Sequence, residues 1–224
     1  MRESGFDAGT RAGQAFRIAS QPAATIMLLS PVRLGGERGR LLFNPGANFP
    51  LARALHTGAG APLGEVFSFV SGLYFRGKAS YARTFARSGD GRPAAFVISA
   101  GGGLLPLDER VTLERLRGWA KVSIHEDNPH FTAPLYRQAS GLVDAHGASA
   151  RFVLLGSVAT GKYVEPLLEV FGDRLLFPEE FLGRGDMSRG SLLLRAVRDG
   201  RELAYAGVRA MLEKREPGRR ARED

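Results

Sequence analysis

Short apolar runs alternate along the chain with segments whose apolar residues recur on one helical face. A short apolar run bounded by turn residues is typical of a buried strand, whereas recurrence at every third or fourth position is typical of a helix. The pattern predicts strands over residues 24–30, 94–99, 151–156, 174–177 and 202–208. It predicts helices over residues 73–87, 112–120, 133–145, 160–171 and 191–198.

This alternation predicts an α/β fold, as a single three-layer domain with a mostly parallel sheet and helices on both faces. We place the domain at residues 23–210, after a flexible N-terminal arm over 1–22 and before a charged C-terminal tail over 211–224. Residues 35–62 form a loop-rich insertion, rich in glycine and proline, with a short helix near 51–56. Long insertions of this kind often carry function.

The composition of the chain excludes some kinds of site and favours some kinds of partner. The chain has no cysteine, which excludes disulfides, thiolate metal sites and a cysteine nucleophile. Its formal charge of +8 favours a polyanionic partner such as nucleic acid. Only four of the 31 basic residues are lysine, so a bias toward arginine, glycine and alanine explains the charge equally well. The apolar run near residue 24 is too short to span a membrane, and we expect a cytoplasmic protein.

The first candidate residues follow predicted parallel strands, because ligands of such sheets bind beyond the carboxyl ends of the strands. Ser30 and Arg33 follow the first strand and suit an anionic oxygen or phosphate. Ser157, Lys162 and Tyr163 follow the strand over 151–156. The glycine spacing before Lys162 does not match a P-loop, so we expect phosphate contact there without nucleotide hydrolysis.

Two further segments are candidates for binding phosphate or a base. Tyr74, Arg76 and Lys78 lie near a predicted helix start, where Tyr74 could stack on a base and the cations could neutralise phosphate. A core role for Tyr74 with solvated cations is the competing interpretation. Ser99 precedes three glycines that could let the backbone approach a ligand or form a plain turn, Gly101, Gly102 and Gly103.

A loop near the last predicted helix adds Arg184 and Arg189 as anion contacts, with Asp186 or the nearby Ser188 as an N-cap. If the protein is an enzyme, three carboxylates are candidate acids or bases: Asp108, Glu165 and Asp186. The four histidines lack the spacing of metal ligands. The Asp-Asn-Pro sequence between His125 and His130 is typical of a turn. We expect no metal and no cofactor.

Four segments, in order, resemble landmarks of the YaaA family of bacterial peroxide-stress proteins: Leu28 to Pro31, Ser71 to Tyr74, Ile98 to Asp108, and Leu155 to Tyr163. The last three also resemble small α/β domains associated with nucleic-acid base modification. Gly102 stands where the family usually has tyrosine, and Val32-Arg33 replaces an Ala-Lys pair. The resemblance implies an α/β fold, DNA binding and a role in oxidative stress.

Together these observations predict a nucleic-acid-associated, stress-response-type protein that binds phosphate and a base at the carboxyl edge of its sheet. Two other functions stay open at this point. One is an enzyme acting on a nucleobase or nucleotide, by base modification or glycosidic-bond chemistry. The other is a non-catalytic, partner-binding domain whose basic surface is compositional. The sequence does not choose among DNA, RNA and free nucleotide, and it leaves the oligomeric state open.

Overall fold

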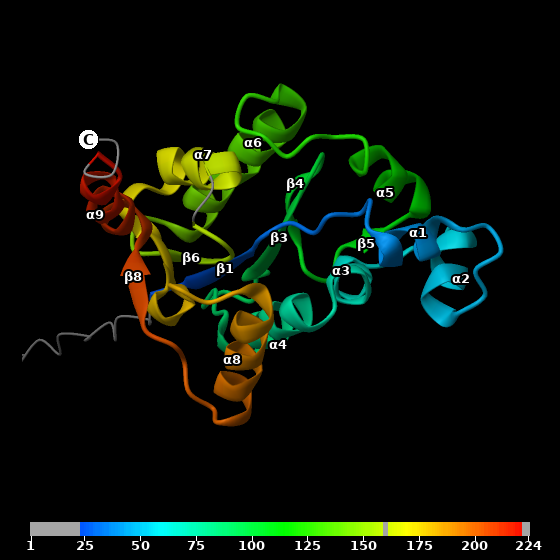
Figure 1. Ribbon diagram of the computed structural model, residues 1–224, viewed down its shortest axis with the longest axis horizontal. Helices are drawn as coiled ribbons and strands as arrows, with labels where there is room; N and C mark the ends of the chain where they lie inside the picture. The colour runs from blue at the N-terminus through cyan, green and yellow to red at the C-terminus, as the bar shows by residue number, and fades with distance from the viewer. Residues whose placement is uncertain (1–22, 159–160, 221–224) are drawn as a thin grey trace, which may run out of the picture.

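A computed structural model describes residues 23–158 and 161–220 of the chain. Within these residues one sheet has the strand order β4-β3-β1-β6-β7-β8 (Figure 1). Its strands are β1 (Thr25–Leu29), β3 (Ala95–Ser99), β4 (Gly103–Pro106), β6 (Arg151–Leu155), β7 (Leu175–Pro178) and β8 (Tyr205–Gly207). The neighbours β3-β1-β6-β7 are parallel, and the outer strands β4 and β8 are antiparallel to theirs. The mostly parallel α/β sheet is confirmed.

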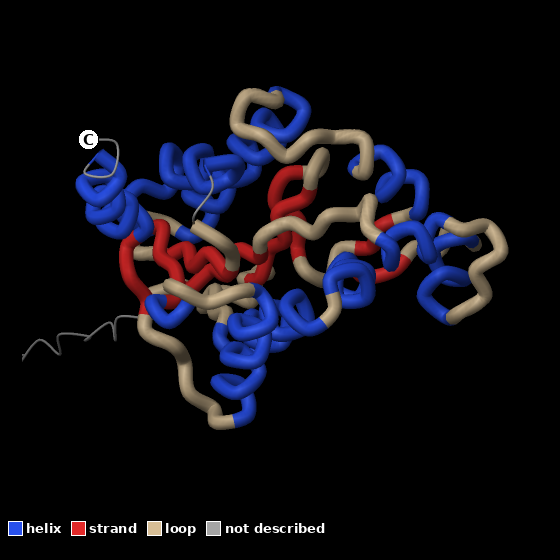
Figure 2. The backbone as a smooth tube through the Cα atoms, in the orientation of Figure 1, coloured by secondary structure: helices blue, strands red, loops and turns tan. Residues whose placement is uncertain are grey.

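The helices lie around this sheet, as Figure 2 shows in blue against the red strands. They are α1 (Glu37–Phe43), α2 (Pro50–His56), α3 (Leu63–Ser71), α4 (Leu73–Phe85), α5 (Leu113–Trp119), α6 (Pro129–His146), α7 (Gly161–Phe171), α8 (Asp186–Arg198) and α9 (Val208–Arg220). Short 3-10 turns follow α7 and β7, η1 (Gly172–Arg174) and η2 (Glu179–Phe181). A separate pair of short strands joins β2 (Ala61–Pro62) to β5 (Arg110–Val111).

Two apolar clusters form on the faces of the sheet, because successive side chains of a strand point to opposite sides. Met27 and Leu29 belong to the cluster that contains residues of α3, α4 and α8. Ile26 and Leu28 belong to the cluster that contains residues of α6, α7 and α9. Figure 1 shows α6 and α7 on one side of the central strands, with α4 and α8 on the other. Every residue of β1 is buried, as a central parallel strand requires.

Most predicted elements lie close to their predicted positions, but the pattern missed strand β4 of the main sheet and the short strands β2 and β5. The insertion at 35–62 contains α1 as well as the expected short helix α2. Helix α3 was missed because its valine, phenylalanine, serine and glycine residues give its sequence only a weak helical propensity. Residues 208–220 form α9, where we expected the end of a strand and a solvated tail; Val208 and Met211 are buried and hold its first turn to the core. The expected arm over 1–22 lies outside the described residues.

No helix among the described residues is long and apolar enough to cross a membrane.

Candidate functional site

In the middle of the sheet, the connections that leave two neighbouring strands run to opposite sides. After β1 the next parallel strand, β3, lies on one side, whereas β6 lies on the other. Leu29 and Leu155 are register partners at the carboxyl ends of β1 and β6, so Ser30 and Gly156 follow them side by side. The connections leave these two strands in opposite directions, which makes this position the usual ligand crevice of an open α/β sheet.

A buried lysine reaches this position from α4. Lys78 is 1% exposed, and its Nζ donates to the Ser30 Oγ at 2.9 Å and to the Ser30 carbonyl at 3.0 Å. The ammonium also lies over the ring of Tyr74, at 4.6 Å from the centroid. No carboxylate of the described residues forms an ion pair with it. Burial therefore lowers the pKa of Lys78 to about 7, and the charge of Asp186 opposes this only in part.

Tyr163, in the first turn of α7, closes the other side of Ser30. Its hydroxyl donates to the Ser157 carbonyl at 2.9 Å and is also hydrogen-bonded to the Ser30 side chain. Burial raises the Tyr163 pKa, and these hydrogen bonds moderate the increase. Gly156 lies directly above this contact. A Cβ there would come within 2.5 Å of the Ser30 Cβ and 3.1 Å of the Tyr163 Oη, so only glycine leaves room.

Tyr74 completes the group. Its Oη is buried and forms no hydrogen bond of standard geometry among the described residues, which is an uncommon and costly state for a hydroxyl. Burial raises the Tyr74 pKa, and the nearby Arg189 guanidinium opposes this. Arg189 is held by the Phe181 carbonyl at 3.2 Å and by Asp186 at 3.5 Å. We call the four residues Ser30, Tyr74, Lys78 and Tyr163 the buried polar cluster.

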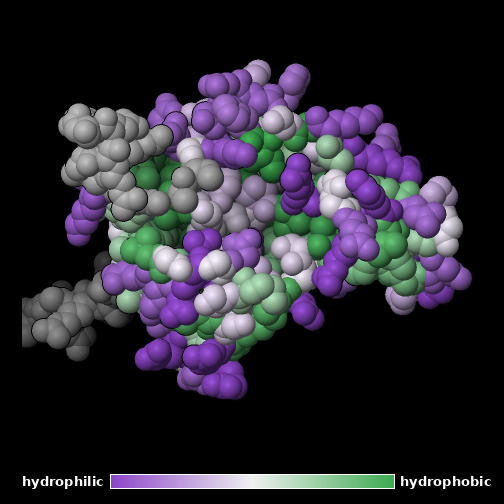
Figure 3. Space-filling view, in the orientation of Figure 1, coloured by the Kyte–Doolittle hydropathy of each residue, from purple (hydrophilic) through white to green (hydrophobic). Residues whose placement is uncertain are grey.

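A wide depression, which we call the cationic cleft, lies beside this cluster. Its volume is about 940 Å³, and it is lined by the segments that follow β1, β3 and α5 and by the start of α7. Its basic lining residues are Arg33, Arg40, Lys121 and Lys162. None of the lining residues is acidic, and none of these four exposed cations forms an ion pair within the described part of the chain. In Figure 3 the face shown is hollowed near its middle, with hydrophilic side chains around the hollow.

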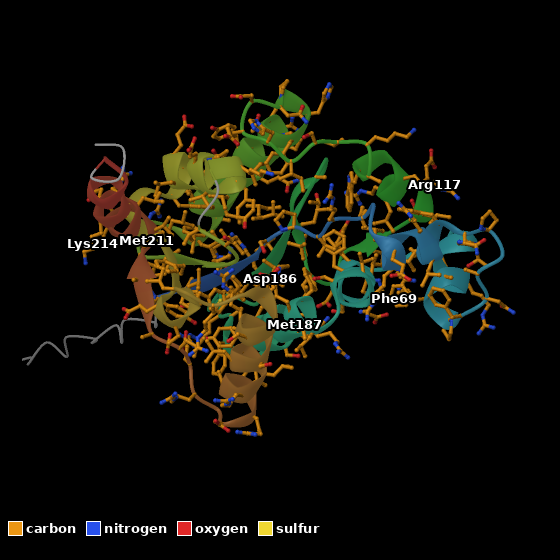
Figure 4. The ribbon with its side chains drawn as sticks, in the orientation of Figure 1. Phe69, Arg117, Asp186, Met187, Met211 and Lys214 are labelled. Carbon is orange, nitrogen blue, oxygen red and sulfur yellow. The ribbon has the colours of Figure 1, made fainter. Side chains whose placement is uncertain are left out.

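A second depression of about 600 Å³ borders Gly156 from the side of β7 and α9, and we call it the apolar cavity. Its lining is largely apolar: Val158, Phe177, Phe181, Leu182, Ala206 and Met211. Arg189 and Lys214 are its cations, and Glu179 is its acid. Figure 4 shows Met211 and Lys214 together on α9, with Asp186 nearer the middle of the molecule at the start of α8. The buried polar cluster therefore lies between two depressions.

The predicted site residues divide among several places. Arg33, Lys162 and Tyr163 line the cationic cleft, and Ser30 and Lys78 lie in the buried polar cluster. Ser157, after β6, contributes the carbonyl that binds Tyr163. Arg189 borders the apolar cavity. These residues are the ones that the fold brings together.

Other predicted residues lie away from this group or have structural roles. Arg76 is exposed beside Arg38, and so lies apart from its predicted neighbours Tyr74 and Lys78. Arg184 is exposed and donates to the Ser188 Oγ at 3.0 Å. Tyr74, Arg76 and Lys78 therefore do not share one face of α4, because Arg76 is exposed whereas the other two are buried together.

The triple glycine forms the turn of the β3–β4 hairpin. The Ser99 Oγ accepts from the Gly102 amide and donates to the Gly103 carbonyl, so it closes this turn. A Cβ at Gly101 or Gly102 would lie within 3 Å of the Trp119 ring, and Gly103 has a φ of +70°. The glycines are thus accounted for by close packing and turn geometry.

The three candidate acids or bases are all exposed. Asp108 follows β4, which runs antiparallel to β3, so it lies at the opposite edge of the sheet and pairs with Arg83 at 2.9 Å. Glu165 lies on the outer side of α7. Asp186 begins α8 and pairs with Arg189. Only Asp186 is near the buried polar cluster, where its charge acts on Lys78.

Sequence reasoning missed Arg40 and Lys121 as cleft residues, and it missed the pairing of Lys78 with Ser30. No local signal connects these residues, because Ser30 and Lys78 are 48 positions apart. The described residues contain no group of three or more histidine, aspartate or glutamate side chains that could hold a metal ion. Comparisons with protein-family models, curated proteins and solved structures find no match to the chain.

Proposed function

We propose that the protein binds a phosphate-bearing ligand of nucleotide size in the cationic cleft, either free or as an exposed unit of a single-stranded nucleic acid. The observation that carries this proposal is a concave site with four unpaired cations and no acidic lining residue. Unpaired cations that converge on a cleft attract anions and hold phosphate oxygens by charge-assisted hydrogen bonds.

The size and position of the cleft favour a nucleotide unit over a duplex. A volume of about 940 Å³ lies at the upper end of the range for small-molecule sites. A concave site admits a single unit more readily than the convex surface of a double helix. The resemblance of four segments to the YaaA family, which implies DNA binding during oxidative stress, supports the same ligand class. Apolar residues of the cleft, including Val122 and Ile124, could contact a base.

The test is a titration of fluorescently labelled single-stranded DNA, single-stranded RNA, duplex DNA and a mononucleotide across a salt series. Trp119 is the only tryptophan of the chain and lines the cleft, so its fluorescence independently reports occupancy. We expect single strands and the nucleotide to bind more tightly than the duplex. Affinity should fall as salt rises, because phosphate contacts release counterions.

Two double variants distinguish binding in the cleft from attraction to the overall positive charge of the protein. Arg33→Ala/Lys162→Ala removes two cations of the cleft and should reduce the logarithmic salt slope for DNA by about 2. The matched control, Arg137→Ala/Arg195→Ala, removes two exposed arginines from α6 and α8 that do not line the cleft. Equal losses of affinity in the two variants, or no binding of the wild type at low salt, would refute the proposal. The charge of +8 would then be explained by composition alone.

A further inference from the structure

The buried polar cluster has a feature that phosphate binding does not use. Lys78 has its nitrogen 2.9 Å from the hydroxyl of Ser30, and no described carboxylate forms an ion pair with it. A buried ammonium without a counter-ion is unfavourable, so the neutral amine is accessible near pH 7. A neutral amine has a lone pair that can accept the proton of the serine hydroxyl, while one N–H still donates to the Ser30 carbonyl.

The surroundings of Ser30 resemble those of an activated nucleophile. The serine stands at the carboxyl end of a central strand, at the point where the chain connections diverge. The hydroxyl of Tyr163 contacts its side chain from one side. Nearby, the buried hydroxyl of Tyr74 forms no hydrogen bond of standard geometry among the described residues, and Arg189 is beside it. A nucleophile, a base within hydrogen-bond reach and orienting hydroxyls together form the arrangement used in nucleophilic catalysis.

Gly156 packs against Ser30 and also lines the apolar cavity. A Cβ at this position would lie 2.5 Å from the Ser30 Cβ and 3.0 Å from its Oγ, so a side chain there would clash with the serine. Gly156 is also part of the wall of the apolar cavity, together with Val158, Phe177 and Phe181. The cavity is large enough, at about 600 Å³, for an apolar group of small-ligand size. The cavity therefore borders the glycine that packs on the serine.

We propose that Ser30 is a catalytic nucleophile with Lys78 as its general base, and that the apolar cavity binds the acyl group of an ester which this pair hydrolyses. This activity goes beyond the binding proposed for the cationic cleft and does not depend on it.

The reaction follows from the positions of the two groups. As the Ser30 Oγ attacks the carbonyl carbon of the ester, its proton moves to the Lys78 Nζ. The bond from the carbonyl carbon to the leaving oxygen then breaks, and the Lys78 ammonium protonates that oxygen to release an alcohol. Water attacks the resulting acyl-serine while Lys78 takes a proton from it. The acid is released, the proton returns to the Ser30 oxygen, and no oxidant or reductant is required.

The experiment treats the full chain with an alkyl fluorophosphonate, which forms a stable bond with activated serines, and locates the adduct by peptide mass spectrometry. We expect one adduct, on Ser30, and turnover of p-nitrophenyl butyrate. The labelling rate should rise with pH through a midpoint near 7 as Lys78 loses its proton. The charged or titratable groups around Lys78 are Tyr74 on its own helix, Asp186 and Arg189 from α8, and Tyr163 from α7. Burial raises the pKa of both Tyr74 and Tyr163 above the ordinary tyrosine value, which moves their titration further from this window.

Lys78→Met should reduce labelling at least about 100-fold, the usual effect of removing a general base. Ser140→Ala, which removes an exposed serine of α6, should leave labelling unchanged. No adduct on Ser30, an adduct on Lys78 itself, or undiminished labelling of a folded Lys78→Met variant would overturn the proposal. Mapping and the pH profile use the wild-type chain, so the test stands even if Lys78→Met does not fold. A negative result leaves the nucleotide titration unaffected, because that titration measures binding at other residues.

Discussion

Two tyrosines of α4 differ in how their hydroxyls are satisfied. Tyr74 and Tyr81 are both buried, but the Tyr74 Oη has no hydrogen-bond partner among the described residues. The Tyr81 Oη accepts from the Leu203 amide at 2.8 Å and shares a 2.7 Å hydrogen bond with the Tyr205 hydroxyl. A buried hydroxyl without a partner lowers stability, whereas a bonded one contributes to it. At the scale of single residues, the two tyrosines of α4 therefore differ in how burial of the hydroxyl affects stability.

The substitution of each tyrosine by phenylalanine should have opposite effects. Tyr81→Phe leaves the buried Leu203 amide unpaired and should lower the free energy of unfolding by about 1–3 kcal/mol. Tyr74→Phe removes an unpaired hydroxyl and should leave that free energy unchanged or raise it by up to about 1 kcal/mol. Urea denaturation of both variants measures the difference. An equal loss in the two would mean that the Tyr74 hydroxyl has a partner.

At the scale of elements, the β3–β4 hairpin shows how a glycine run can serve packing. Strands β3 and β4 are antiparallel neighbours, and Gly103 pairs with Ser99 at their junction. The backbone of Gly103 has a φ of +70°, and a Cβ there would lie 2.5 Å from the Pro134 carbonyl of α6. Both the dihedral angle and the space exclude a side chain. The hairpin can thus approach α6 closely only with glycine at this position.

Gly103→Ala should destabilise the protein by about 2 kcal/mol or more, because it combines an unfavourable φ with a backbone clash. The matched control is Gly141→Ala in the interior of α6, where a Cβ meets nothing within 4 Å. That change should stabilise the protein by about 0.5–1 kcal/mol, since alanine favours helix more than glycine does. Thermal and urea unfolding of both variants measure these changes in stability. An unchanged free energy of unfolding in Gly103→Ala would contradict the hairpin geometry.

At the scale of the whole molecule, Lys78 couples folding to pH. Its pKa is about 7 when folded, against an ordinary value of 10.5. Below pH 7 the lysine is protonated in both states, so the full cost of its burial is present. Between the two values the unfolded chain binds a proton that the folded chain does not, so the free energy of unfolding rises with pH. The contribution approaches about 1.4 kcal/mol per pH unit in this window.

The prediction concerns the difference in stability between the wild type and Lys78→Met. In urea denaturation at pH 6, 7, 8 and 9, the free energy of unfolding of the wild type should rise relative to that of the variant from pH 7 to 9. This difference should change little from pH 6 to 7. Taking the difference cancels the titration of groups common to both chains. A constant difference from pH 7 to 9 would mean that Lys78 keeps its proton when folded.

The sequence alone determined the central fold, because hydrophobic periodicity is a local property. The strands near residues 25, 95 and 151 are short buried runs, and the crossover rule makes them parallel and places Ser30 and Ser157 at one edge of the sheet. The same rule placed Arg33 and Lys162 at the carboxyl edge of the sheet, and the structure brings both into the lining of the cationic cleft. Elements that produce a regular spacing of apolar residues can therefore be predicted from the sequence.

Only the tertiary structure decided which polar residues meet. Lys78 looked like a surface cation beside Arg76, yet one is buried against Ser30 and the other is exposed, because burial depends on what packs over each face of α4. Asp108 looked like a site residue, yet the antiparallel course of β4 carries it to the far edge. Helix α8, distant in sequence, packs on α4 and completes the enclosure of Lys78. Contacts of this kind depend on the folded path of the chain, so no local pattern encodes them.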